Sequence, residues 1–199
     1  MLDVSRNGVL RTHTVEQLIR HFAMMGLNQL MLYTEDTYKL PGEPQFGYFR
    51  GGYTHDELKH LDDYAALFGI EVVPCIQTLG HLEQTLQWPD FRPLLDTGGV
   101  LLAGDPRTDA LVEKMIAAAS APFRSKRIHI GMDEAHGIGS GQYRFRNGLR
   151  TPFDILSYHL QRTADTGRRR GPAPIIWSDM FFRVGSKTNQ YYDRDSVIS

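Results

Sequence analysis

Hydrophobic residues recur along the chain in two alternating patterns. Short apolar runs, which we predict to be β-strands, occupy residues 1–6, 27–33, 70–76, 127–133 and 174–177. The segments between these runs carry apolar residues three or four positions apart, which is the period of an amphipathic α-helix. We therefore predict five strands alternating with four helices, a succession that favours a parallel sheet with right-handed crossovers.

Capping residues indicate where the predicted helices begin and end. Thr14 and Thr54 are each followed three residues later by Gln or Glu, which is the spacing of a capping box, and a glycine stands after each of these helices. We expect a third helix over about residues 109–119. A fourth helix is predicted to begin after Thr151, with a proline in its first turn, and to end at Gly167.

The connections differ in length at the two ends of the predicted strands. Long loops follow two strands, at residues 35–53 and 77–106, whereas only a few residues follow each helix. Functional side chains are therefore expected at the carboxyl ends of the strands, as in both α/β barrels and doubly wound sheets. A barrel spreads its chemistry over all such loops, which fits the scattered polar residues, and no G-x-G-x-x-G motif follows the first strand.

We therefore predict an α/β fold of the (β/α)8 TIM-barrel type, as a single domain over residues 1–199. About five βα units are present, whereas a complete barrel needs about 250 residues. We expect a partial barrel that is cut at both ends. Its open sheet edge invites association, which leaves a homo-oligomer open.

Composition and charge restrict the partners of the chain. With 41% hydrophobic residues and a formal net charge of -1, the sequence fits a globular domain and gives no electrostatic reason to bind nucleic acid. No apolar segment approaches the ~20 residues that cross a bilayer, so no membrane contact is expected, and the first residues lack the layout of a signal peptide. The single Cys75 lies in a predicted buried strand, and we expect a cytoplasmic protein.

The segment that carries chemistry is residues 127–136. Its apolar residues alternate with a period of two, which predicts that His129, Gly131 and Asp133 point into the barrel, with Asp133 at its top. Glu134 follows where the strand gives way to a loop, so it can turn toward the same space. Two adjacent carboxylates are costly to ionise together, so one is expected to keep its proton and act as an acid. The alternative is that both only cap the following turn.

The string from His129 to Glu134 reads H-I-G-M-D-E and resembles the H-x-G-x-D-E motif of family 20 glycoside hydrolases, the β-N-acetylhexosaminidases. Four other segments resemble strands of that family in the same order, namely residues 1–6, 33–36, 74–81 and 176–179. The likeness covers nearly the whole chain. It implies an enzyme that removes terminal, non-reducing GlcNAc or GalNAc from a glycan or glycoconjugate and that needs no cofactor.

The resemblance also implies a retaining mechanism in which the substrate, rather than the enzyme, supplies the nucleophile. The oxygen of the sugar's 2-acetamido group attacks the anomeric carbon. Glu134 would protonate the leaving oxygen and then activate water, as general acid and base. Asp133 would hydrogen-bond the acetamido N–H, orienting that group and stabilising the positive charge of the intermediate.

Further polar and aromatic residues at the predicted strand ends are candidates for substrate binding: His81, Trp177, Asp179, Asp36, Arg6 and His129. At a barrel mouth, Trp177 would form a wall for a sugar, although its pattern is equally that of a core residue. In the family that the chain resembles, a histidine in the position of His81 lies near the catalytic site. Asp36 and Arg6 are equally compatible with structural ion pairs.

Two other interpretations of this segment are set aside. His129, Asp133 and His136 are residue types that bind zinc, but His129 is expected two strand layers below the loop that carries His136, so we predict no metal. Residues 133–136 also read D-E-A-H, a string found in nucleic-acid helicases, but that function requires a G-x-x-x-x-G-K-[ST] loop and the sequence has none. Two alternatives stay open: a catalytically silent carbohydrate-binding fragment and another barrel glycosidase.

Overall fold

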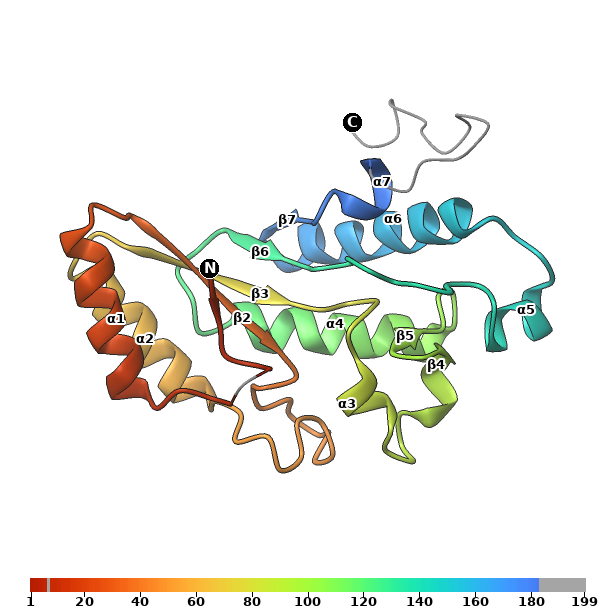
Figure 1. Ribbon diagram of the computed structural model, residues 1–199, viewed down its shortest axis with the longest axis horizontal. Coiled ribbons are helices and arrows are strands. Elements are labelled where there is room, and N and C mark those ends of the chain that lie inside the picture. The colour runs from red at the N-terminus through yellow and green to blue at the C-terminus, as the bar shows by residue number, and fades with distance from the viewer. Residues whose placement is uncertain (7, 183–199) are drawn as a thin grey trace.

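The computed structural model describes residues 1–6 and 8–182 (Figure 1). The single domain predicted over residues 1–199 therefore reaches beyond the described part of the chain. Strands and long helices follow one another in the order that the sequence predicts. Their bounds are β1 Leu2–Asp3, α1 Thr12–Met24, β2 Gln29–Glu35, α2 His55–Ala66, β3 Glu71–Ile76, α4 Pro106–Ser120, β6 Arg127–His129, α6 Pro152–Arg170 and β7 Ala173–Ile175.

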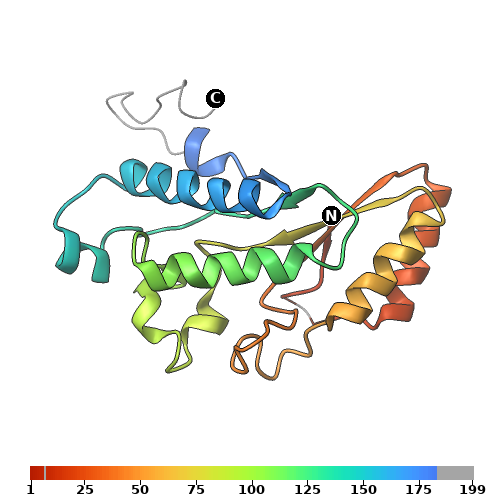
Figure 2. The same cartoon turned by 180° about the vertical axis from the view of Figure 1, so that it is seen from behind.

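These five strands form one parallel sheet in the order β1-β2-β3-β6-β7. Helices α2, α4 and α6 lie on one face of this sheet, as the two opposite views in Figures 1 and 2 show. The apolar stripes of these helices bury side chains such as Leu61, Met115 and Leu156 in the core. Because all five strands run in the same direction, their carboxyl ends meet at one edge of the sheet.

Helix starts agree with the prediction in part. The capping box of Thr54 and Glu57 at the start of α2 is confirmed in both directions, and α6 begins after Thr151 as expected. The prediction that Thr14 caps the first helix is wrong. Helix α1 begins three residues earlier, at Thr12 with Arg11 in the N-cap position, and the backbone N–H of Thr14 already donates to the carbonyl of Arg11 in the first turn.

The predicted end of the last long helix at Gly167 is also wrong. Helix α6 continues to Arg170, and Gly171 ends it with a φ of 112°. A glycine inside a helix costs only about 1 kcal/mol, so packing can carry the helix through it. A Cβ at Gly167 would lie an ordinary 3.4 Å from the carbonyl oxygen of Pro172, so this position leaves room for a methyl group.

The strand that precedes the carboxylates is shorter than predicted. Strand β6 ends at His129, because Gly131 and Met132 both adopt left-handed backbone conformations with φ of 72°. The expected alternation of inward and outward residues therefore stops after His129. Asp133 lies on an irregular loop rather than at the top of a regular strand.

The long loops contain elements that the sequence did not predict. Those after β3 and β6 hold four short elements and a 3-10 turn: α3 Glu83–Leu86, Arg92–Leu94, the antiparallel pair β4 Leu95–Thr97 and β5 Val100–Leu101, and α5 Gln142–Asn147. A short helix, α7 Asp179–Phe182, follows β7. Among the helices of the described residues, none has the length and apolar character that a membrane span requires.

Candidate active site

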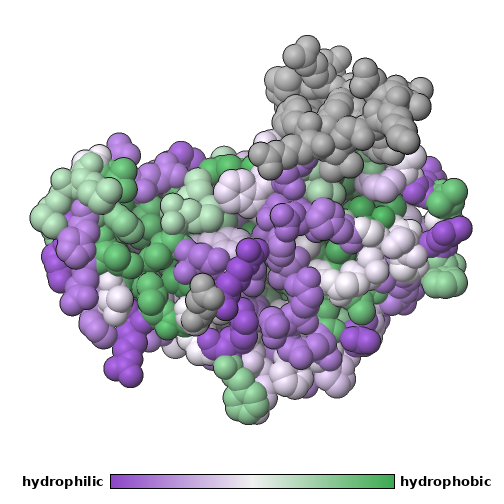
Figure 3. Space-filling model, viewed as in Figure 1, coloured by the Kyte–Doolittle hydropathy of each residue, from purple (hydrophilic) through white to green (hydrophobic). Residues whose placement is uncertain are grey.

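Asp133 lies at the centre of a connected set of polar side chains at the carboxyl ends of the strands. Its Oδ1 accepts a hydrogen bond from Gln77 Nε2 at 2.6 Å, and its Oδ2 lies 3.2 Å from His81 Nε2. Because Gln77 and His81 follow β3 and Asp133 follows β6, these contacts join two neighbouring strand ends. In Figure 3, hydrophilic residues gather across the middle of the face that the helices leave uncovered.

Both members of the pair formed by His81 and Asp133 are shifted toward their charged forms. The hydrogen bond to Asp133 raises the pKa of His81, against the opposing effect of burial. Burial acts to raise the pKa of Asp133, but the hydrogen bonds from His81 and Gln77 outweigh it, and the pKa of this carboxyl is lowered. Asp133 is therefore held as an anion, the form that accepts strong hydrogen bonds.

Glu134 has a different environment from its neighbour. Its side chain is 61% exposed, against 19% for Asp133, and its Oε2 lies 3.6 Å from His81 Nε2. The backbone N–H of Glu134 donates to Asp179 Oδ2 at 3.3 Å, which ties the residue to the start of α7. Two carboxylates in unlike surroundings can take unlike roles, one as a fixed anion and the other as a proton donor.

The loop that carries His81 packs closely on the carboxylate segment. A Cβ at Gly80 would lie 2.7 Å from the backbone carbonyl oxygen of Asp133, so this approach requires glycine. Thr78 adds a hydrogen bond from its hydroxyl to the carbonyl of Ile130 at 2.8 Å. The end of β3 is thereby fixed against the end of β6.

The rings of Trp177 and His129 lie in contact, with centroids 4.6 Å apart and their planes tilted by 52°. Trp177 is 37% exposed, whereas His129 is only 2% exposed. Burial lowers the pKa of His129 to about 4, and its Nδ1 accepts the N–H of Gly131 at 3.1 Å. His129 is therefore neutral and enclosed, in a position to support the tryptophan.

Arg6 and Asp36 lie in an ion-pair cluster at the ends of β1 and β2. The Nε of the exposed Arg6 is 3.3 Å from Glu35 Oε1. Arg50 lies 3.1 Å from the buried Asp36 and also donates to the carbonyl of Ser5 at 2.8 Å. This geometry matches the ion-pair alternative for Asp36, whereas Arg6 stays accessible to a ligand.

Sequence reasoning missed four residues of this cluster: Tyr33, Glu35, Arg50 and Gln77. The hydroxyl of Tyr33 donates to Glu35 Oε1 at 2.9 Å and accepts from Gln77 Nε2 at 3.0 Å, so it connects the ends of β2 and β3. Burial raises the pKa of Tyr33. A signal for Gln77 did exist, since it is the first polar residue after an apolar strand. Arg50 offers none, because it lies 14 residues beyond its partner Asp36.

Backbone strain marks the same region. Five non-glycine residues in the described chain have a positive φ, and four of them lie here: Glu35, His81, Met132 and Glu134. Such conformations cost about 1–3 kcal/mol each and persist where the surrounding structure enforces them, often at functional sites. The positions of His81 and Glu134 are thus imposed by the fold rather than by local preference.

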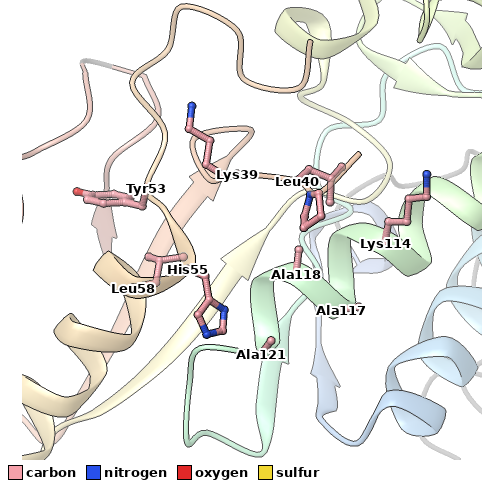
Figure 4. A pocket seen from close by; sticks show the side chains of 10 residues that line it. Lys39, Leu40, Tyr53, His55, Leu58, Lys114, Ala117, Ala118 and Ala121 are labelled. Atoms are coloured by element: carbon pink, nitrogen blue, oxygen red, sulfur yellow. The ribbon is translucent and has the colours of Figure 1, made fainter. Parts of the chain in front are cut away.

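Away from this cluster, the described residues offer little for hydrolytic chemistry. A cavity of about 360 Å³ lies between α2 and α4 (Figure 4). Its lining is largely apolar, with Leu40, Leu58 and Ala118 beside Lys39 and Lys114, and contains no carboxylate. Within residues 1–6 and 8–182, no three His, Cys, Asp or Glu side chains are placed to hold a metal ion.

A parallel sheet backed by helices, with two carboxylates and an aromatic ring at its strand ends, defines part of a (β/α)-barrel with a site of the glycoside hydrolase kind. Comparison with known protein families identifies which glycoside hydrolase family the chain matches. Residues 1–195 match the catalytic domain of glycosyl hydrolase family 20, and the chain belongs to this family.

Relatives and solved structures agree with this membership. Human hexosaminidase D is 28% identical over 168 residues, which are 80% of this chain and 35% of that protein, and the bovine hexosaminidase D is 26% identical over 80% of this chain and 49% of its own. The N-acetyl-β-hexosaminidase of Streptomyces plicatus superposes with a TM-score of 0.73 at 26% identity, over 90% of this chain and 38% of that one.

A more distant structure shares the fold alone. The exo β-N-acetylglucosaminidase of Vibrio harveyi superposes with a TM-score of 0.79 at 19% identity, over 93% of this chain and 36% of that one. The family and its structural neighbours confirm the predicted TIM-barrel type, of which this chain covers a part. The chain spans about a third to a half of the length of the curated relatives it matches.

Proposed function

We propose that this protein hydrolyses the glycosidic bond of a terminal, non-reducing N-acetylhexosamine in a glycan or glycoconjugate. The observation that carries the proposal is the arrangement of Asp133 and Glu134, which are adjacent, held in unlike environments and joined through His81. Membership of family 20 and the hexosaminidase names of the human, bovine and Streptomyces relatives support the substrate class.

In the proposed reaction, the oxygen of the sugar's own 2-acetamido group attacks the anomeric carbon as the bond to the leaving oxygen breaks. Glu134 donates its proton to that oxygen. A water molecule then attacks the anomeric carbon of the oxazolinium-like intermediate, gives its proton to Glu134 and displaces the acetamido oxygen, so the acetamido group is restored. Glu134 returns to its starting form, and the sugar keeps its anomeric configuration. The exposure of the Glu134 side chain leaves room for both the leaving group and the water.

Asp133 acts on the acetamido group in this proposal. Its carboxylate accepts the acetamido N–H and stabilises the positive charge that develops as the ring closes. Gln77 and His81 already hold one oxygen each, and each oxygen keeps a second lone pair for the substrate. The carboxylate therefore needs no reorganisation when the sugar binds.

The remaining candidate residues bind and orient the sugar. Trp177 offers an apolar surface for the pyranose ring or the acetamido methyl, supported by His129 behind it. Arg6 offers guanidinium N–H donors to sugar hydroxyls from the end of β1. Asp179 holds the backbone of Glu134 and so sets the position of the acid.

The test is the kcat/KM of the full-length protein on an aryl N-acetyl-β-glucosaminide, compared with the Glu134→Gln variant. Removing the general acid should lower kcat/KM by about 10²–10⁴-fold. The matched control is Glu113→Gln, an exposed carboxylate on α4 that pairs with Arg170 on the outer face, and it should leave turnover unchanged. Unchanged turnover in Glu134→Gln would refute the acid assignment.

Two other outcomes of the same assay separate the alternatives. Faster turnover of the corresponding aryl glucoside, which lacks the acetamido group, would indicate another kind of barrel glycosidase. Binding of N-acetylglucosamine without any hydrolysis would indicate a silent carbohydrate-binding protein.

A further inference from the structure

Gln77 is fully buried and is bonded at every polar position of its side chain. It follows β3 directly, and its Oε1 accepts the backbone N–H of Met132 at 3.2 Å. Its Nε2 donates to Asp133 Oδ1 at 2.6 Å and to the hydroxyl of Tyr33 at 3.0 Å. One amide group therefore connects the ends of β2, β3 and the carboxylate loop.

The orientation of this amide follows from its partners. A backbone N–H can only donate, so the group that faces Met132 must be the carbonyl oxygen of Gln77. The NH₂ group then points toward Asp133, which accepts from it. The fit is close, because a Cβ at Gly131 would lie 2.2 Å from Gln77 Oε1, so glycine is required there for the amide to enter.

We propose that Gln77 is a positioning residue for the hydrolysis, whose neutral amide holds the Asp133 carboxylate ionised and aimed at the substrate's acetamido N–H. This inference rests on the proposed function and deepens it. A neutral donor suits the role, because it stabilises the anion without adding a charge that the cationic intermediate would feel. A carboxylic side chain in the same place would instead compete with Asp133 for a proton.

Other titratable groups limit what Gln77 alone can contribute to the ionisation of Asp133. Cys75, His81 and His129 lie close enough to interact with its charge. Tyr33 bonds Gln77, Glu134 is the next residue in the chain, and Asp179 accepts the backbone N–H of Glu134. Among the residues that the structure describes, His81 alone matches Gln77 in donating directly to the carboxylate. Tyr33 acts through Gln77, since its hydroxyl accepts from the amide and donates onward to Glu35.

The test is the pH dependence of kcat/KM for the full-length enzyme and two Gln77 variants of similar volume. Gln77→Leu removes a donor to the Asp133 anion, so the acid limb should move to higher pH by about one unit. Gln77→Glu replaces the amide by an acid that shares one proton with Asp133, so activity should persist at low pH and the alkaline limb should move to lower pH as the pair loses that proton.

The matched control is Thr78→Val, which is also buried and also loses a hydrogen bond between β3 and β6, but does not touch Asp133. The acid and alkaline limbs of its pH profile should stay at the wild-type pH, even if the variant is less stable. Wild-type limbs in both Gln77 variants, with only a uniform loss of rate, would overturn the proposal and leave Gln77 a packing residue.

A second measurement does not depend on activity. In protein labelled with ¹³C at aspartate carboxyls, the Asp133 signal is identified by its loss in Asp133→Asn, and its titration midpoint should rise in Gln77→Leu. An unchanged midpoint would refute the role of Gln77 even if the wild type hydrolyses the sugar. Conversely, a midpoint that rises in Gln77→Leu, together with a wild type that shows no hydrolysis, would support the contact while the proposed function fails.

Discussion

Replacing Gly80 by alanine tests whether the close packing of the loops that carry His81 and Asp133 matters. The added methyl carbon would lie 2.7 Å from the carbonyl oxygen of Asp133 and 3.4 Å from the Cα of Ala135. Both are backbone atoms, so no side chain can rotate away to relieve the first contact. The loop of His81 and the segment of Asp133 must therefore separate by several tenths of an ångström.

The expected consequences are losses of both stability and activity. Forcing one extra carbon into a packed site typically costs about 1–3 kcal/mol of unfolding free energy. The hydrogen bond between His81 and Asp133 is already 3.2 Å long, so a further separation weakens it directly. Displacing catalytic groups by about 1 Å can cost about 10²-fold in rate, and we expect kcat/KM to fall by about 10-fold or more.

The assay measures kcat/KM on an aryl N-acetyl-β-glucosaminide together with urea unfolding. Gly167→Ala in α6 is the matched control, because a Cβ there meets its nearest neighbour at an ordinary 3.4 Å and helix propensity favours alanine by about 1 kcal/mol. It should keep full activity and unfold at higher urea. If Gly80→Ala kept the kcat/KM of the wild type, the contact between the two loops would not set the active geometry.

Three further predictions concern stability and reactivity. Thr54→Ala removes the capping box of α2 and should lower the unfolding free energy by about 1 kcal/mol, with activity retained. The pKa of His81 is raised in the folded state, so its pair with Asp133 stabilises the fold fully below the ordinary value of 6.5 and loses this contribution as the pH rises through the folded pKa. The stability difference between wild type and His81→Gln, measured by urea unfolding, should therefore shrink from about pH 5 to about pH 8. Burial raises the pKa of the Cys75 thiol to about 12, so an aromatic disulfide reagent should react with it only after unfolding.

The fold was largely predictable because its signals are local. Apolar runs and segments with helical periodicity alternate along the chain, and the capping box of Thr54 and Glu57 involves residues only three positions apart. The errors fall where tertiary structure overrides a local signal. Thr14 has the spacing of a cap but lies inside the first turn, and Gly167 resembles a helix end although packing carries α6 past it.

The candidate site was predictable only where a motif spans neighbouring residues. Asp133 and Glu134 stand side by side, so the sequence exposes them. Gln77 meets Asp133 across 56 residues, and such a contact leaves no trace in local patterning. The early end of β6 was equally hidden, because Met132 is an apolar residue whose left-handed backbone is set by its surroundings.

The hydrogen bond between the Glu134 backbone and Asp179 has a consequence for folding during synthesis. These residues are separated by 45 positions, and the N–H of Trp177 likewise donates back to the carbonyl of Gly131. A ribosome delivers Glu134 well before Asp179 and Trp177, at about 5–20 residues per second. A nascent chain that stalls before β7 therefore carries both carboxylates without the contacts from Asp179 and Trp177 that fix their loop.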